Sequence, residues 1–420
     1  MSLLLLSSGL PRIPLIRPGW ISPLLSFARA QLAGVESTYY DGTQWRTAAA
    51  NMPRFVPGLK IEGQRTNAIR NSRLSFSSAP SFPQSTLPTY WSQSTNSGLT
   101  VSVVGNGAEG GIDYVDIRFS GTTTAGKQNN LFWEATGAVS ASASQVWMQS
   151  AFLRLAGGAL TNVSTINMYC LDNGGGSSVP LLTMPTSAAL STQRQSKTFT
   201  TAASGVTAFT LLGLVFTFAA GAIDFTIRLG WPQLEQASFA GAPILPPALS
   251  PAASTRGASL VSAPLASVFP SRRGVLLWSG AWGQNAPSGV DQTALQIDDG
   301  SANNRFRVRN AGGGATVVAG RVTSGSAVDA TTLGSMTAGS QTSLGLAFDL
   351  DAGVYKALLR GGSVQSGSGG PTSASTVRLG TDSAGASAMF GDTSEWNAIP
   401  GIYPSDALLA QLVNSMPLAA

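Results

Sequence analysis

Histidine is absent from this chain of 420 residues, and cysteine occurs once. Without histidine there is no histidine-activated nucleophile, no two-histidine zinc site and little means of proton transfer near neutral pH. The lone Cys170 excludes an intrachain disulfide and a cysteine-rich zinc site. We expect Cys170 to be a small buried apolar residue, and any chemistry must depend on carboxylates.

Charge is also scarce. Charged residues make up 11% of the chain and hydrophobic residues 43%, which is not the composition of a disordered protein. The formal net charge of +5 comes from 21 arginines and four lysines against 20 acidic residues. These charges are dispersed along the chain, so we expect no nucleic-acid partner.

Two apolar stretches do not have the features of export or membrane segments. The four leucines at 3–6 have no preceding cationic segment and are followed by prolines, so we expect no signal peptide. Residues 198–223 carry no charge, but threonines and serines interrupt them and the apolar residues alternate. We therefore expect a buried β-hairpin there and no membrane insertion.

The residues that are abundant favour an all-β fold. The chain has 48 glycines and 23 prolines, and short alternating apolar stretches are separated by turn residues. We predict two β-sandwich domains, at residues 72–242 and 269–420, joined by a proline-rich linker at 243–268. The second resembles a jelly-roll or concanavalin-like sandwich, and Ser405 is placed to cap a short helix that packs back on it.

Residues 1–26 are rich in leucine and proline. Proline fixes φ and removes an amide donor, so we expect an extended arm that joins no sheet centre. An apolar arm of this kind either frays or orders on a partner surface, and we favour docking onto another protein. The candidate docking residues are Leu5, Leu6, Arg12, Ile16, Arg17 and Trp20.

Residues 27–71 contain distinctive phrases and predict a small β collar. Phe27, Arg29 and Ala30 are followed by Tyr-Tyr-Asp-Gly at 39–42, Thr-Ala-Ala-Ala-Asn at 47–51 and Ile-Glu-Gly-Gln-Arg-Thr-Asn at 61–67. Taken alone, they indicate a strand, an Asp41-Gly42 turn and a second strand through Trp45. This block resembles one found in tail-fibre, head-fibre and head-spike proteins of tailed phages, where it precedes lectin-like β-sandwiches.

The resemblance implies a virion-surface structural protein, with capsid, portal-vertex or tail subunits as partners and host polysaccharide as the ligand. It also implies a homo-oligomer. We expect no enzyme activity and no cofactor. A purely structural decoration or baseplate component without glycan binding is one alternative, and a polysaccharide depolymerase is another.

The candidate glycan-binding residues are of two kinds. Aromatic planes stack on sugar rings, and the tryptophans and tyrosines predicted to be exposed are Tyr90, Trp91 and Trp282. Arg305 and Arg307 alternate with apolar residues, so a strand would project their guanidiniums from one face, beside Asn303 and Asn304. A solvated sheet face is the alternative for the arginines.

Carboxylates provide two further hypotheses. Asp298 and Asp299 form a candidate Ca²⁺ site, although ordinary turn chemistry explains them as well. Glycoside hydrolysis needs two carboxyls that face one sugar bond. Glu109, Asp113, Asp116 and Glu134 are the acids of the first sandwich, and their spacing singles out no catalytic pair.

Overall fold

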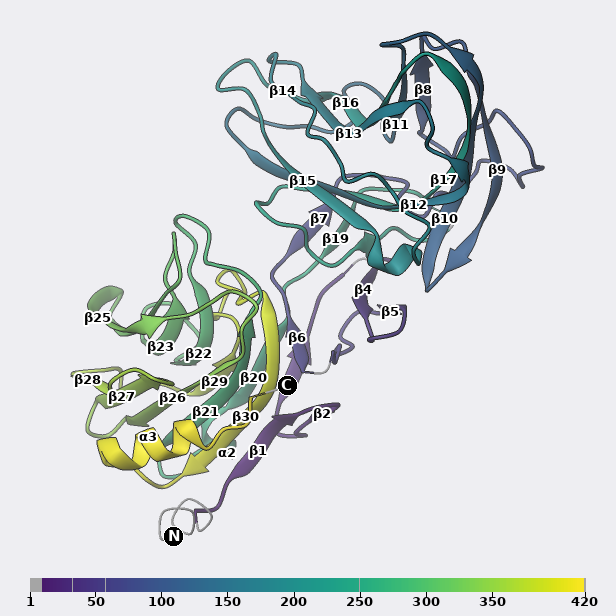
Figure 1. Ribbon diagram of the computed structural model, residues 1–420. Helices are drawn as coiled ribbons and strands as arrows, with labels where there is room; N and C mark the ends of the chain where they lie inside the picture. Colours follow the sequence, from purple (N-terminus) through teal and green to yellow (C-terminus); the bar gives the residue numbers. More distant parts are fainter. Residues whose placement is uncertain (1–9, 32, 57, 249, 419–420) are drawn as a thin grey trace. The chain divides into compact units, whose positions relative to one another are not determined.

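The computed structural model describes residues 10–31, 33–56, 58–248 and 250–418, and they form two compact units (Figure 1). Unit 1 takes its described residues from Met1–Ala30, Ala50–Gln64 and Gly257–Ala420. Unit 2 takes its own from Gln31–Ala49 and Arg65–Arg256. Each unit is a sandwich of antiparallel sheets, as the all-β prediction requires.

The boundaries of the units differ from the predicted ones. The expected collar at 27–71 is shared between the two units, and the expected linker at 243–268 is folded into them. Ile244 and Leu245 form a strand and are fully buried, and Leu265 and Val268 belong to a buried helical turn. The prolines at 243–264 therefore separate short strands and a helical turn, and the segment is not a free linker between domains.

Unit 1 has two sheets. The first runs in the order β2 (Trp20–Ile21), β1 (Ile13–Arg17), β30 (Gly391–Pro400), β21 (Arg273–Trp282), β26 (Thr342–Asp349), β27 (Val354–Leu359) and β28 (Gln365–Ser368), with β6 (Leu59–Ile61) also paired to β30. The second runs in the order β25 (Ser326–Ser335), β24 (Thr316–Thr323), β23 (Arg305–Asn310), β22 (Gln292–Asp298), β29 (Thr376–Leu379), β20 (Leu260–Pro264) and β3 (Ser26–Ala28).

The core of unit 1 lies between these sheets. Strand alternation turns Phe306 and Val308 of β23 inward, and they meet residues such as Tyr355 of β27, whose ring centroid is 5.2 Å from that of Phe306. A short helix, α2 (Leu265–Val268), contributes Leu265 and Val268 to the same core.

A C-terminal helix, α3 (Asp406–Asn414), packs on the outer face of the first sheet. Ser405 caps it, because its side chain accepts a hydrogen bond from the Leu408 amide at 3.3 Å. Leu409, Leu412 and Val413 are fully buried against this sheet. The predicted capped helix is thus confirmed.

The predicted N-terminal docking arm is wrong for its described residues. Residues 13–17 form β1, which pairs with β30, and Ile16 is fully buried. Pro14 is tolerated because the pairing register shifts between Pro14 and Ile16, at a bulge, where a missing amide donor costs little. Pro18-Gly19, with Gly19 at φ 74°, then forms the turn to β2.

The remaining candidate docking residues fall into three cases. Arg12 donates a hydrogen bond from its Nη2 to Ser415 Oγ at 2.8 Å. Arg17 is the strand partner of Trp20 across the β1–β2 turn, and Trp20 is 41% exposed. Leu5 and Leu6 lie outside the described residues.

Unit 2 has two main sheets and two small ones. One main sheet runs in the order β15 (Arg194–Thr200), β12 (Val146–Ala159), β17 (Gly221–Glu235), β10 (Ile112–Thr123) and β9 (Thr100–Glu109). The other runs in the order β14 (Ser177–Ser178), β13 (Val163–Asp172), β16 (Phe209–Phe218), β11 (Gln128–Phe132) and β8 (Ser92–Thr95). The small sheets are β18 (Ile244–Leu245), β4 (Glu36–Tyr40) and β5 (Trp45–Ala48), and β19 (Ser254–Arg256) with β7 (Arg65–Asn67).

The core of unit 2 joins the two main sheets. Phe119 of β10 lies 4.7 Å from Phe216 of β16 and 4.9 Å from Phe225 of β17, measured between ring centroids. The uncharged stretch at 198–223 contains the largely buried strand β16 together with the end of β15, a loop at 201–208 and the start of β17. It is not a hairpin, because β16 and β17 belong to opposite sheets. Within the described residues no helix is long and apolar enough to span a membrane.

The predicted Tyr39–Trp45 hairpin is present as β4 and β5. Asp41 accepts hydrogen bonds from the amides of Thr43 and Gln44, at 2.8 and 2.9 Å, and Arg46 lies 2.6 Å from its other oxygen. These donors hold the pKa of Asp41 well below its usual range, the backbone bond from Gln44 being the largest cause. The turn places Trp45 against Phe152 and Trp231, with centroids 5.5 and 6.1 Å away.

Four polar residues of the 27–71 block that carry its resemblance are internal. Arg29 and Arg54 are fully buried, Glu62 is 5% exposed and Asn67 is 1% exposed. Arg54 and Glu62 form an ion pair, and Asn51 Oδ1 accepts the Arg29 amide at 2.9 Å. The block is therefore framework, and it contributes to both units.

Candidate functional site

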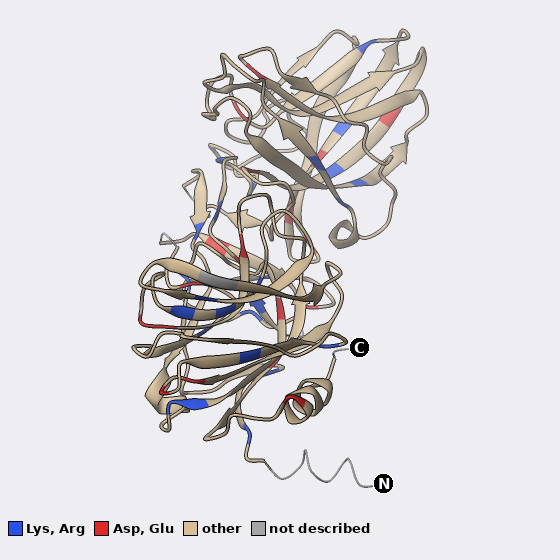
Figure 2. Cartoon of the chain, turned by 90° about the vertical axis from the view of Figure 1, so that its left-hand side faces the viewer, with Lys and Arg blue, Asp and Glu red and all other residues tan. Residues whose placement is uncertain are grey.

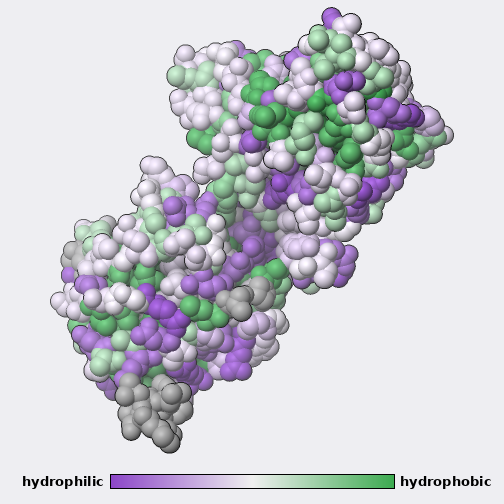
Figure 3. Space-filling view, in the orientation of Figure 1, coloured by the Kyte–Doolittle hydropathy of each residue, from purple (hydrophilic) through white to green (hydrophobic). Residues whose placement is uncertain are grey.

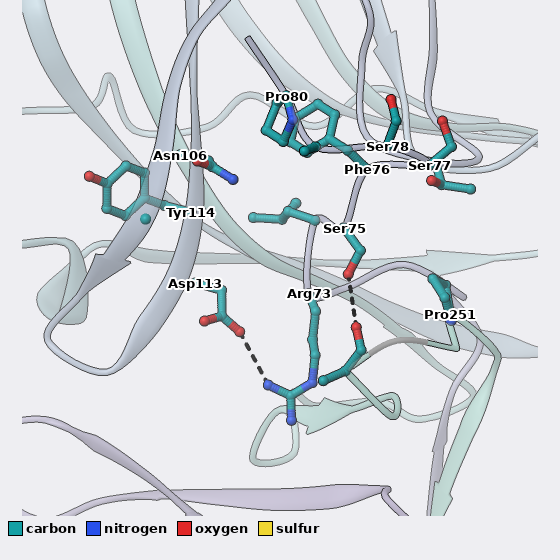
Figure 4. Close-up of a pocket in the computed structure, with 15 residues that line it drawn as sticks. Arg73, Ser75, Phe76, Ser77, Ser78, Pro80, Asn106, Asp113, Tyr114 and Pro251 are labelled. Carbon is teal, nitrogen blue, oxygen red and sulfur yellow. Dashed lines mark hydrogen bonds and ion pairs between the residues drawn. The ribbon is translucent and has the colours of Figure 1, made fainter. Parts of the chain in front are cut away.

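Unit 2 contains a cleft with a volume of about 640 Å³ (Figure 4). One wall is the segment 73–80 with Thr89. The opposite wall is the β9–β10 hairpin, which presents Asn106, Gly107, Asp113 and Tyr114. Ala248 and Pro251 complete the lining.

Charged residues at the base of the cleft are held by one another. The Nε of Arg73 donates a hydrogen bond to the carbonyl oxygen of Pro246 at 2.7 Å. Its Nη1 donates to Asp113 Oδ2 at 3.3 Å, and the guanidinium also forms an ion pair with Glu36. Asp113 Oδ2 further accepts the indole N–H of Trp231 at 3.2 Å. These bonds fix the guanidinium and the carboxylate in place, so that the base is rigid.

Aromatic side chains line both walls. Tyr114 is half-buried, and the guanidinium carbon of Arg228 lies 3.6 Å from its ring centroid. Gly107, opposite Tyr114 on β9, leaves room for the phenol, because a Cβ there would lie 2.9 Å from the hydroxyl oxygen. On the other wall Phe76 is half-buried and packs edge-on against Phe82 at 6.2 Å.

The polar groups at the rim are exposed and neutral. Asn106, Ser77 and Ser78 are exposed, and in Figure 4 Asn106 lies between Tyr114 and the Phe76 and Pro80 side chains. An apolar ring face beside an amide and two hydroxyls is the combination that binds a sugar, through stacking and through hydrogen bonds to its hydroxyls. The cleft therefore has the chemistry of a neutral glycan subsite.

Most acids of unit 2 are ion-paired with arginines, whereas Asp172 accepts hydrogen bonds from backbone amides. Glu109 lies 2.8 Å from Arg154 and 2.6 Å from Arg228, and Arg228 also binds Asp116 at 2.8 Å. Burial alone would raise the pKa of Glu109, but the Leu190 amide and the two arginines outweigh it and lower the pKa. Glu134 binds Arg70 at 2.7 Å.

These pairings bear on glycoside hydrolysis. A general acid for that reaction must keep its proton near neutral pH, which requires a raised pKa. An arginine partner favours the charged carboxylate instead. The pairing of these four acids, Glu109, Asp113, Asp116 and Glu134, with arginines therefore favours a structural role.

Trp91 and Trp282, two of the three aromatic residues predicted to stack on sugar rings, are buried. Trp282 is fully buried, with its indole N–H 3.4 Å from the Gln292 carbonyl oxygen, and Trp91 is 7% exposed and packs on Trp133. Both belong to strand or turn segments that face the core, so their position in glycine- or serine-rich sequence was misleading. Tyr90 is 39% exposed but lies outside the cleft lining, 3.7 Å below the guanidinium of Arg70.

The predicted arginine strand exists in unit 1. Arg305, Arg307 and Arg309 are half-buried and alternate with buried residues along β23. Arg307 and Arg309 both approach Asp291 Oδ2, at 3.0 and 2.8 Å. Burial first, and the charges of Arg309 and Arg305 second, lower the pKa of Arg307 to about 10.

The loop before this strand has a structural role. Asn304 donates to Asp299 Oδ2 at 2.8 Å and accepts the Ser324 amide, while Asn303 is exposed. Asp298 is fully buried and accepts from Arg378 at 2.7 Å and from Gln296 at 2.8 Å.

The same contacts bear on the candidate Ca²⁺ site. Ser301 and Asn304 bind Asp299 and lower its pKa. No group of three acidic or cysteine side chains suited to a metal occurs in the described part of the chain. Asp298 accepts hydrogen bonds from Arg378, and Asp299 accepts them within its own turn, so these contacts favour the turn chemistry that the sequence also allowed.

The cleft residues were missed by sequence reasoning. The alternation of Tyr114, Asp116 and Arg118 with Val115 and Ile117 places the first set on one face of β10. This alternation was enough to predict that Tyr114 shares a face of its strand with Asp116 and Arg118. No pattern connects β10 to Phe76 or Pro251, because their proximity arises only from the fold.

No family model and no curated protein matches this chain. Among solved structures, one described as from A. japonicus CB05 has 12% identity and a TM-score of 0.24, covering 69% of this chain and 66% of that one. The N-terminal CBM22-1-CBM22-2 tandem domain of Xyn10C from Paenibacillus barcinonensis has 10% identity and a TM-score of 0.23, covering 81% and 97%.

A fructosyltransferase from A. japonicus has 12% identity and a TM-score of 0.21, covering 68% of this chain and 64% of that one. This chain thus spans about two thirds of the length of the two A. japonicus chains. Similarities at these TM-scores carry no argument about fold or function.

Proposed function

We propose that this chain is a surface protein of a tailed phage or phage-like particle, and that unit 2 binds a host glycan in the cleft between the segment 73–80 and the β9–β10 hairpin. The particle assignment depends on the resemblance of residues 27–71 to phage fibre and head-spike proteins. The binding assignment depends on one observation: Phe76 and Tyr114 line opposite walls, and Asn106 lies at the rim between them.

The cleft supports weak, repeated binding. An open cleft that offers two partly buried rings covers a small part of a sugar chain, so a single site gives modest affinity. Many copies on one particle raise the effective concentration and convert weak sites into firm attachment. This role requires no catalytic carboxylate, and the ion-paired acids of unit 2 agree with it.

A glycan array probed with the full chain tests the binding assignment. We expect a signal for host polysaccharides that Phe76→Ala and Tyr114→Ala reduce at least tenfold, if removing a stacking ring costs about 1–3 kcal/mol, as it does where a base stacks on an aromatic side chain. Tyr90→Ala is the matched control, since Tyr90 is an exposed tyrosine outside the cleft lining. It should leave the signal unchanged.

Other outcomes point to the alternatives. Silence across the array, with folded protein, favours a structural decoration or baseplate role without glycan binding. Release of reducing ends from a host polysaccharide favours a depolymerase. Imaging of the particle with a tag on this chain tests the virion assignment separately, because a chain absent from particles contradicts it whatever the array shows.

A further inference from the structure

The second feature that points to a ligand is an arginine face in unit 1, formed by Arg305, Arg307 and Arg309 on β23 (Figure 2 shows basic residues within the strands of this unit). Strand alternation puts all three guanidiniums on the side of the sheet that faces away from the sandwich core. The pairing register adds Gln296 and Asp298 of β22 to the same face, opposite Arg307 and Arg305. Arg378 of β29 follows, opposite Gln296.

The acids on this face do not satisfy every arginine. Asp298 is engaged by Arg378 at 2.7 Å, and Asp291 receives both Arg307 and Arg309 on a single oxygen. Arg305 has no ion-pair partner within 4 Å among the described residues. Asp382 acts on it only at longer range, with Oδ1 already accepting the amides of Ala384 and Ala386.

Several buried polar atoms on the face lack a hydrogen-bond partner in the described structure, and two of them belong to Arg305 and Gln296. One is Nε of Arg305, a hydrogen-bond donor, and the other is Oε1 of Gln296, an acceptor on a side chain that is fully buried. A half-buried guanidinium without an acceptor costs free energy, and an anionic oxygen that binds it recovers that cost.

We propose that the arginine face binds the carboxylate or sulfate groups of an acidic polysaccharide, with Arg305 as its main contact. An acidic sugar carries an anionic oxygen that can accept hydrogen bonds from the half-buried guanidinium of Arg305, for which the described residues provide no ion-pair partner. The site lies in unit 1 and is independent of the neutral glycan cleft of unit 2.

Titration calorimetry of the full chain with oligogalacturonate tests this proposal, with dextran sulfate as the sulfate-bearing probe and neutral dextran as the uncharged one. We expect at least one anionic polymer to bind and neutral dextran not to bind. Arg305→Gln should weaken that binding at least tenfold, which is the loss of one charge-assisted hydrogen bond of about 1.5–3 kcal/mol. Arg17→Gln is the matched control, an exposed arginine of the same unit, and should change affinity less than twofold.

Three further measurements test the role of Arg305, the chemical group that it binds and the independence of this site from the cleft. Arg305→Gln should melt at or above the wild-type temperature, because it removes a charge that has no internal partner. Inorganic sulfate competing at millimolar concentration would assign the contact to the anion itself, and failure to compete would assign it to the anion with its sugar ring. Tyr114→Ala should leave binding of the acidic polymer intact, which separates this site from the cleft.

Two results would overturn the proposal. One is the absence of binding to both anionic polymers by folded wild-type protein. The other is an equal loss in Arg17→Gln and Arg305→Gln, which would indicate attraction by the diffuse positive charge of the chain.

Discussion

Ile16 of β1 lies directly opposite Trp396 of β30, and both side chains are fully buried. This pairing makes the N-terminal segment an integral strand of the unit 1 sandwich. Leu15 and Ile16, which the sequence analysis placed in an arm for a partner protein, are instead covered by the chain itself. Loss of this segment should therefore lower the stability of unit 1.

The first prediction concerns that strand. Ile16→Ala should lower the free energy of unfolding of unit 1 by about 2–5 kcal/mol, because it leaves a cavity beside Trp396. Trp20→Ala, at a residue that is 41% exposed, should change it by about 0.5 kcal/mol or less. Urea unfolding monitored by tryptophan fluorescence measures both, and equal small effects would mean that β1 is dispensable.

The second prediction concerns a glycine that lets two elements meet. Gly111 has φ 82°, and a Cβ there would lie 1.9 Å from the carbonyl oxygen of Trp45. Gly111→Ala should therefore destabilise unit 2 by about 3 kcal/mol or more, through backbone strain and steric overlap together. Gly137 has φ 77° with open space around its Cβ position, so Gly137→Ala should cost only the strain, about 1–2 kcal/mol.

Thermal unfolding of the two glycine variants compares strain with overlap directly. The near-UV circular dichroism of Gly111→Ala should also change, since Trp45 packs on Trp231. Equal losses in the two variants would contradict the close contact between the β9–β10 turn and Trp45.

Local patterns in the sequence predicted strands, turns and the capped helix well. Alternation along β10 and β23 and the Asp41-Gly42 turn depend on residues close in the chain, so periodicity and turn chemistry suffice for them. Ser405 could be assigned as a helix cap for the same reason.

Long-range partners could not be predicted. Proline in residues 11–23 argued against a sheet, yet β30, nearly 400 residues later, provides the pairing for β1 and a bulge accommodates Pro14. Trp91 lies in polar sequence and Trp282 lies just before a loop with glycine and asparagine, and the packing of distant strands buries both. The cleft likewise combines residues near 75, 110 and 250, which no local pattern connects.

Glu109 provides a prediction about pH. Its pKa is lower in the folded chain than its ordinary value of 4.5, because the Leu190 amide and two arginines outweigh burial. The carboxylate thus stabilises unit 2 above about pH 4.5, and this contribution is lost as the pH falls through the folded-state value. Glu109→Gln should therefore be less stable than wild type at pH 7, and the difference should shrink as the pH drops below 4.5.

Urea midpoints of wild type and Glu109→Gln between pH 7 and pH 3 measure this difference. Asp41 and Asp224, whose pKa values are also lowered, are retained in both proteins and cancel in the comparison. A gap between the two curves that stays constant with pH would contradict the assigned role of Glu109.

The last prediction uses the only thiol. Cys170 of β13 is 4% exposed, as the sequence indicated, and burial raises its pKa well above the usual range. Because the thiolate is the reactive form, a disulfide reagent such as Ellman's should not label the native chain and should label one thiol per chain in urea. Ser85→Cys, at an exposed position, supplies the fast reference. Native labelling of Cys170 at a rate near that reference would mean that the sandwich of unit 2 opens readily around β13.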